Sequence, residues 1–173
     1  MAKTILYWFR NDLRLHDNPA LHYACQQADY LLPIYWWDTT QQQHTTWGFV
    51  RQGQHRQVFL KQALQDLSQQ IQGLASQLTV LAANRVTVLA DIARQYHVDE
   101  IVCEEIAAPE EQQQVQTLRN LGIKVTCIWQ SSLYAPTQLP FPIEQLPNVF
   151  SQFRQKIEKA QCLVAQPIAT INS

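Results

Sequence analysis

Short apolar segments alternate with helical patterns between residues 4 and 129, and this alternation constrains the fold more than any other feature of the sequence. The apolar segments are rich in Ile, Leu, Val, Tyr and Trp, which are residues that favour buried strands. Their short length also favours strands over helices. We expect strands at residues 4–9, 29–36, 78–82, 100–103 and 124–129.

Helical patterns separate these strands. Asn18 and Pro19 stand in the usual order of an N-cap and a first helical residue, so a helix is expected to begin there. Strands that are joined by helical crossovers form parallel sheets covered by helices. We therefore predict an α/β domain over residues 1–130, with a five-stranded parallel sheet in the order 3-2-1-4-5 and helices on both faces. Apolar stripes of helical period predict further helices at residues 55–71 and 86–96. Pro109 near the first helical position and Gly122 as a cap predict another at residues 109–121.

Prolines mark two departures from this regular pattern. Pro33 falls inside the second predicted strand, where proline cannot donate to a central ladder, so we expect it at a bulge or near the strand end. Several further prolines fall between residues 130 and 148, which indicates an extended segment. A short helix is expected at residues 149–159. We predict that residues 131–173 form an interdomain linker that contains this helix.

Charge and apolar content argue against several classes of protein. The formal net charge is −1, so the domain lacks the basic surface that binds nucleic acid. No apolar run reaches the ~20 residues of a membrane span, and we find no secretory signal pattern. The cysteines form no C-x-x-C pair, and Cys103 and Cys127 fall in apolar segments, as reduced core thiols do. We expect a cytoplasmic protein that contacts neither nucleic acid nor membrane through this domain.

A ligand is expected at the carboxyl edge of the sheet, where the strand order reverses. For the predicted order this point lies between the first and fourth strands, beside the loops at residues 10–18 and 104–111. The sequence has no G-x-G-x-x-G there, no P-loop and no G-x-S-x-G, and its histidines lack metal-ligand spacing. We predict no catalytic residue and no metal site in this chain.

Charged residues of these two loops each allow two roles. Arg10 and Arg14 can bind an anionic ligand, or they can clasp the loop by pairing with nearby carboxylates and carbonyls. The glutamates of the second loop can accept hydrogen bonds from the N–H groups of a heterocycle: Glu104, Glu105, Glu110 and Glu111. Glu110 and Glu111 can also simply favour a helix N-terminus, which attracts negative charge. Both roles stay open at this point.

Four segments carry a resemblance to a known family. They are residues 8–21 (WFRNDLRLHDNPAL), 32–35 (LPIY), 56–67 (RQVFLKQALQDL) and 146–158 (LPNVFSQFRQKIE). The first is similar to the amino-terminal signature of the photolyase/cryptochrome family. The last resembles the linker of its DASH-type cryptochromes. The similarity extends over roughly residues 3–159, which is nearly the whole chain.

The resemblance implies an α/β antenna domain that docks on a larger helical domain, which holds FAD and reads DNA. In that family a chromophore, often methenyltetrahydrofolate, lies between the two domains. Glu110 and Glu111 match the family's folate-contacting positions, and Glu105 and Arg10 complete our cofactor-binding candidates. The chain ends where the helical domain would begin. The resemblance therefore implies no DNA repair by these residues alone, and FAD only where a helical domain is supplied elsewhere.

Several functions follow from this resemblance. We expect a domain that holds an antenna chromophore or docks on a separate FAD-binding helical domain. A stand-alone nucleotide- or flavin-binding module is one alternative, and a self-associating protein without a ligand is another. A further alternative is a piece of a complete DASH-type cryptochrome or deoxyribodipyrimidine photolyase, which acts in light-driven DNA repair or blue-light sensing. A bound near-UV-absorbing pterin favours the first function, and a bound adenine nucleotide favours the stand-alone module.

Overall fold

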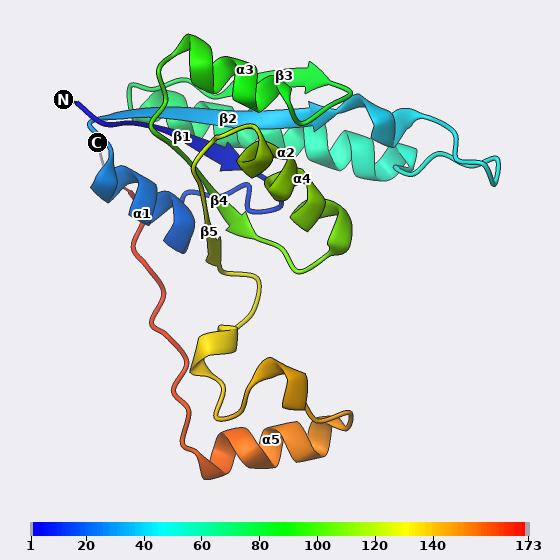
Figure 1. The fold of residues 1–173 in the computed structure, drawn as a ribbon, viewed down its shortest axis with the longest axis vertical. Coiled ribbons are helices and arrows are strands. Elements are labelled where there is room, and N and C mark those ends of the chain that lie inside the picture. The colour runs from blue at the N-terminus through cyan, green and yellow to red at the C-terminus, as the bar shows by residue number, and fades with distance from the viewer. Residues whose placement is uncertain (1, 172–173) are drawn as a thin grey trace.

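The structure is a computed structural model that describes residues 2–171. Its centre is one five-stranded sheet in the order β3-β2-β1-β4-β5, in which all neighbouring strands run parallel (Figure 1). This confirms the predicted fold class and strand order. The strands are β1 (Thr4–Phe9), β2 (Tyr30–Asp38), β3 (Thr79–Ala83), β4 (Glu100–Glu105) and β5 (Val125–Trp129).

Helices cover both faces of the sheet, so β1 is buried on both sides. Successive side chains of a strand point to opposite faces. Ile5, Tyr7 and Phe9 therefore join the core beneath α1 and α2, while Leu6 and Trp8 join the core beneath α3 and α4. These four helices are α1 (Pro19–Gln27), α2 (Gln54–Gly73), α3 (Val88–Gln95) and α4 (Pro109–Asn120).

Three strands run further than predicted at their carboxyl ends, β3 by one residue to Ala83 and two others by two residues each. β2 continues to Asp38, which is the register partner of Ala83 on β3, and β4 continues to Glu105, the partner of Trp129 on β5. Polar residues at strand ends look like loop residues in a sequence, yet their backbone still pairs with a neighbouring strand. The extension carries polar and charged side chains to the edge of the sheet where a ligand is expected.

The expectation for Pro33 was wrong. Pro33 lies in the middle of β2, opposite Tyr7 of β1, with no bulge in the β1–β2 register. The pairing of β2 with β3 begins only at Ile34. β3 therefore does not pair with β2 at the level of Pro33, so the missing N–H of the proline is tolerated.

After β5 the chain leaves the sheet. It forms two short 3-10 helices, η2 (Pro136–Gln138) and η3 (Ile143–Gln145), and then α5 (Phe150–Lys159), which lies well away from the sheet in Figure 1. An extended segment then returns to α1. There the Asp17 N–H donates to the Ile168 carbonyl at 3.0 Å, and the Ile168 N–H donates to the Asp17 carboxylate at 3.1 Å.

The linker role of residues 131–173 stays a prediction, and residues 172 and 173 lie outside the described range. Across residues 2–171, the structure contains no helix that is both long and apolar enough to cross a membrane.

Candidate functional site

The loop after β1 is organised around the buried carboxylate of Asp12. This carboxylate accepts hydrogen bonds from the Tyr7 hydroxyl, the Arg10 backbone N–H (2.8 Å), the Asn18 amide (3.2 Å) and the Gln130 amide (2.9 Å). Burial and then the Asp12 charge raise the pKa of Tyr7 well above its usual range, so its hydroxyl stays a donor. Asn18 also caps α1. The loop is therefore held by β1, by α1 and by the residue that follows β5.

Arg10 connects this loop to α4. Its guanidinium donates to the Glu104 carbonyl (3.3 Å), the Glu111 carbonyl (3.2 Å) and the Gln114 side-chain oxygen (3.0 Å). It also lies 4.6 Å from the centroid of the Trp8 ring. These buried contacts are those of a structural clasp, which was one of the two roles expected for Arg10. Because the side chain also lines the cavity described next, its ligand-binding role stays a prediction.

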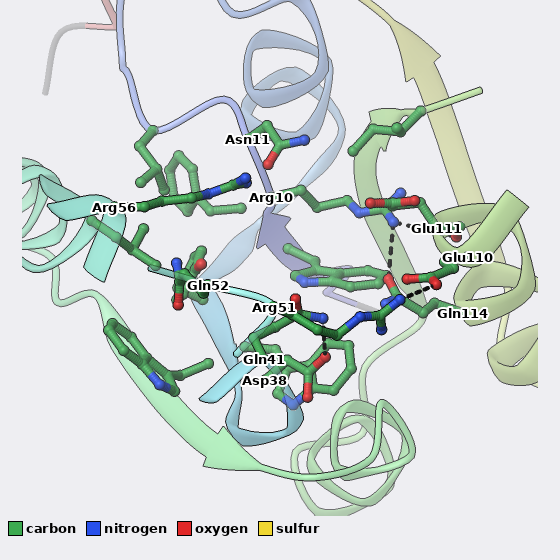
Figure 2. A pocket seen from close by; sticks show the side chains of 18 of the residues that line it. Arg10, Asn11, Asp38, Gln41, Arg51, Gln52, Arg56, Glu110, Glu111 and Gln114 are labelled. Atoms are coloured by element: carbon green, nitrogen blue, oxygen red, sulfur yellow. Dashed lines mark hydrogen bonds and ion pairs between the residues drawn. The ribbon is translucent and has the colours of Figure 1, made fainter. Parts of the chain in front are cut away.

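A cavity of about 380 Å³ lies at the carboxyl edge of the sheet, over the ends of β1 and β2 and between the N-terminal turns of α2 and α4 (Figure 2). Its volume is in the range of small-molecule sites, roughly 300–1,000 Å³. Aromatic side chains line part of it: Trp8, Phe9, Tyr35, Trp36, Trp37 and Phe59. Polar side chains, labelled in Figure 2, line another part: Arg10, Asn11, Asp38, Gln41, Arg51, Gln52, Arg56, Glu110, Glu111 and Gln114.

Opposite charges face one another across this cavity. Arg51, from the loop before α2, forms an ion pair with Glu110 in the first turn of α4, and this hydrogen bond raises the pKa of Arg51. Asp38 accepts a hydrogen bond from Gln41 at 3.1 Å. Within residues 2–171, the carboxylate of Glu111 makes no hydrogen bond to another side chain. The cavity thus combines a closed ion pair with a carboxylate that can accept bonds from a ligand.

Three of the four predicted cofactor-binding residues meet in this cavity. Arg10, Glu110 and Glu111 line it, whereas Glu105 lines a second hollow beside α4. Glu105 stands at the end of β4, which pairs with β1 and β5, whereas the cavity lies over the ends of β1 and β2. The structure brings Glu105 together with Arg10 in that second hollow, but not with Glu110 and Glu111. Cofactor binding by any of the four stays a prediction.

Sequence reasoning missed the part of the cavity that β2 supplies. Asp38 ends β2, Gln41 and Arg51 lie between β2 and α2, and Arg56 lies in the first turn of α2. The expected crevice lay between the first and fourth strands, but the cavity extends over β2 as well. One available signal was the aromatic run of residues 35–37, which ends in a charged residue at the same edge of the sheet.

Glu104 is a buried carboxyl group beside the clasp. Its Oε1 atom accepts a hydrogen bond from the Ser131 hydroxyl at 3.0 Å, while its buried Oε2 atom has no partner among the residues that the structure describes. Burial and then the Asp12 charge raise the pKa of Glu104. In the same range, no group of three or more His, Cys, Asp or Glu side chains is placed to hold a metal ion.

Fold and site together define a class: a doubly wound parallel α/β domain with a ligand-sized cavity near the point where the strand order reverses. Within that class the chain belongs to the DNA photolyase family, whose model matches residues 5–171. The matches to DASH-type cryptochromes agree with the resemblance that the sequence showed.

Similar proteins are much longer than this chain. The chain is 38% identical to the cryptochrome DASH of Synechocystis over 162 residues, which are 90% of the chain and 33% of that protein. It is 34% identical to the cryptochrome DASH of Xenopus laevis over 164 residues, which are 91% of the chain and 31% of the relative. The chain thus spans about a third of the length of these relatives.

Solved structures show the same fold. The Synechocystis cryptochrome matches with a TM-score of 0.90 and 34% identity, over 97% of this chain and 36% of that one. A photolyase from Sulfolobus tokodaii matches with a TM-score of 0.82 and 22% identity, over 98% of this chain and 37% of that one. That structure contains two FAD molecules and is described as implying a novel light-harvesting cofactor. At this identity the likeness shows the fold alone.

Proposed function

We propose that this domain holds a light-harvesting chromophore in the cavity at the carboxyl edge of its sheet, with methenyltetrahydrofolate as the first candidate. The observation that carries the proposal is the combination, in one cavity, of aromatic walls with facing carboxylates and arginines. Aromatic walls suit a flat ring, and carboxylates accept hydrogen bonds from ring N–H groups. When bound, such a chromophore supplies light absorption and energy transfer, so the domain's part is positioning and electrostatic tuning.

Individual side chains suit the two ends of a folate. The pterin end carries N–H donors, and the Glu111 carboxylate, which has no side-chain partner within residues 2–171, is suited to accept them. The glutamate end carries carboxylates, and Arg56 lines the opposite part of the cavity. Glu110 is already paired with Arg51, so it contributes by holding the wall in place and by adding negative charge near the ring.

A titration tests this proposal directly. The purified chain is titrated with methenyltetrahydrofolate, and binding is followed by fluorescence. Replacing Glu110→Gln and Glu111→Gln together should weaken binding by at least about tenfold, because charge-assisted hydrogen bonds contribute ~1.5–3 kcal/mol each. The matched control is Glu144→Gln, an exposed glutamate outside the cavity, which should leave binding unchanged. Equal binding by the wild type and the double variant would remove these glutamates from the site.

A flavin or nucleotide in the same cavity is the second candidate. It is favoured by Arg51 and Arg56, because guanidinium groups bind phosphates in two-point geometry, and by the aromatic walls. The two candidates differ in which variant disrupts them. Arg56→Gln should weaken FMN binding more than methenyltetrahydrofolate binding, whereas the double glutamine variant should do the reverse. The identity of any ligand that copurifies, a pterin or an adenine nucleotide, is a second discriminator.

We further propose that residues 131–171 help this domain to dock on a flavin-bearing helical domain, in a protein that serves light-driven DNA repair or blue-light sensing. Large apolar side chains on this segment are uncovered: Leu133 is 73% exposed, Phe150 74% and Leu163 85%. Uncovered apolar patches mark interaction surfaces.

The free thiols of the chain are in keeping with a cytoplasmic location.

Sedimentation velocity tests the docking proposal. The isolated chain should self-associate as its concentration rises, because the apolar side chains lack their usual cover. Changing Phe150→Asp and Leu163→Asp together should restore the monomer. A chain that is monomeric at every concentration, with or without these substitutions, would contradict the proposed docking surface while leaving the chromophore proposal untouched.

A further inference from the structure

Two cysteines face each other across β4 and β5. Cys103 and Cys127 are register partners on these neighbouring parallel strands, and their Sγ atoms lie 3.8 Å apart. Register partners project from the same face of a sheet, and adjacent strands are ~4.8 Å apart. A disulfide needs Cα atoms ~4.4–6.8 Å apart and sulfur atoms ~2.05 Å apart. The backbone is therefore already at a distance that a disulfide can bridge, and the sulfur atoms must approach each other.

The two thiols differ in their access to solvent. Cys103 is fully buried in the core beneath α3 and α4. Cys127 is half-buried and lines the second hollow, of about 650 Å³, together with Arg10, Glu105 and Arg119. A small reagent that enters this hollow meets Cys127, and the sulfur of the buried Cys103 lies 3.8 Å from the sulfur of Cys127.

Charged groups around the hollow favour the thiolate form of Cys127. The Arg119 guanidinium lies 3.8 Å from its Sγ atom and is anchored by a 3.0 Å hydrogen bond to the Val125 carbonyl. A hydrogen bond from the Cys103 thiol has the largest effect on the pKa of Cys127, and it lowers that pKa. Together with the positive charges of Arg119 and Arg10 it brings the pKa of Cys127 to about 7, against the opposing effects of burial and Glu105. The thiolate is the nucleophilic form of cysteine.

We propose that Cys103 and Cys127 form a dithiol that reacts with hydrogen peroxide and closes to a disulfide. In the first step the Cys127 thiolate attacks one peroxide oxygen. The O–O bond breaks, an S–O bond forms, and hydroxide leaves, so that Cys127 becomes a sulfenic acid. In the second step the Cys103 sulfur attacks the Cys127 sulfur. The S–O bond breaks, the S–S bond forms, and the hydroxyl group leaves as water with the Cys103 proton. Two thiols are oxidised and one peroxide is reduced.

This dithiol is independent of the chromophore proposal. It uses the hollow beside α4, whereas the proposed chromophore site lies over β1 and β2. Arg10 is the one charged side chain that lines both spaces. Failure of folate binding therefore leaves the dithiol proposal standing, and failure of the peroxide reaction leaves the chromophore proposal standing.

The reactivity of individual thiols gives the first test. The wild-type chain is alkylated with iodoacetamide across a pH series, and each cysteine is followed by mass spectrometry of its peptide. We expect Cys127 to react with a midpoint near neutral pH and Cys25 with a higher one, because burial raises the pKa of Cys25. Arg119→Gln should slow Cys127 about threefold at pH 7. The matched control Arg94→Gln changes an exposed arginine on α3 and should have no effect.

The peroxide reaction gives the second test, in a chain with Cys25→Ser and Cys162→Ser. Hydrogen peroxide should remove two hydrogen atoms from the intact mass and yield a peptide that joins Cys103 to Cys127. In a Cys103→Ala chain, or Cys103→Ser if alanine impairs folding, dimedone should instead trap a sulfenic acid on Cys127. Two results would overturn the proposal: peroxide that oxidises Cys127 without any cross-link to Cys103, or a Cys127 that is no more reactive than Cys25 at neutral pH.

Discussion

Replacing Arg10 by alanine tests whether the loop after β1 is a structural clasp. The guanidinium ties this loop to the end of β4 and to the first two turns of α4 through three hydrogen bonds, to Glu104, Glu111 and Gln114. It also packs against the Trp8 ring. Alanine removes all of these contacts and leaves two buried or half-buried carbonyls without their donor. The variant should therefore unfold more readily than the wild type.

The size of the effect follows from the geometry. A hydrogen bond from a charged donor contributes ~1.5–3 kcal/mol, but only the Gln114 bond, at 3.0 Å, has a favourable length. The two carbonyl bonds, at 3.3 and 3.2 Å, are weaker. We expect Arg10→Ala to lower the free energy of unfolding by about 3 kcal/mol in total. Arg10→Lys keeps the charge and loses the fork of donors, so about half of that loss is expected.

Urea unfolding followed by tryptophan fluorescence measures this change, provided that the m-value is the same for all variants. Arg14→Ala is the matched control, because Arg14 is exposed and, within residues 2–171, its side chain donates only to the Asp17 carbonyl. Its loss should stay within about 0.5 kcal/mol. An Arg10→Ala chain that unfolds at the wild-type midpoint but has lost folate or FMN binding would refute the clasp and assign Arg10 to the ligand.

Two buried carboxyl groups of β4 should give opposite pH dependences. Burial raises the pKa of Glu104 in the folded chain. Ionised Glu104 therefore lowers the stability of the fold; this loss is absent below the unfolded pKa of ~4.3 and grows as pH rises through the folded pKa. Glu104→Gln should therefore stabilise the chain by about 1 kcal/mol at pH 7 and by nothing near pH 4, as urea titrations at both values can measure. Burial also opposes the ionisation of Glu100, but hydrogen bonds from Thr126, Lys3 and Lys124 outweigh it and lower the pKa of this carboxyl. The stability that Glu100 contributes is thus present above the unfolded pKa and is lost as pH falls through the folded pKa, so Glu100→Gln should destabilise most at neutral pH. If Glu100→Gln lowered the free energy of unfolding equally at both pH values, the proposed ion pairing of Glu100 would be contradicted.

Much of the fold could be predicted because local patterns and packing agree. The bounds of β1 match the prediction, since its apolar run begins directly after Lys3 and ends at the polar residues 10–12. The start of α1 also matches, because Asn18 and Pro19 carry an explicit capping signal. Pro33 shows where local rules fail: its effect on a strand depends on where the neighbouring strand begins, and only the three-dimensional register reveals this.

The candidate site was only partly predictable. Glu110 and Glu111 could be placed at the carboxyl edge because the strand order reverses beside them. Arg51 and Arg56 could not, since they lie beyond a polar loop whose path over the sheet is set by tertiary contacts. The facing of Cys103 and Cys127 was hidden for a similar reason, because register between β4 and β5 depends on the crossover through α4.

A chimera gives the most direct test of the central claim, that the cavity at the carboxyl edge holds a light-harvesting chromophore. Residues 1–173 replace the matching third of the Synechocystis cryptochrome DASH. We expect the rest of that protein to take the place of the helical domain and to supply the other wall of a cleft. Absorption spectra are recorded after incubation with methenyltetrahydrofolate and gel filtration. The account predicts a near-UV pterin band that is retained by the chimera and lost on Glu110→Gln with Glu111→Gln. A folded chimera that binds FAD but retains no pterin would contradict it.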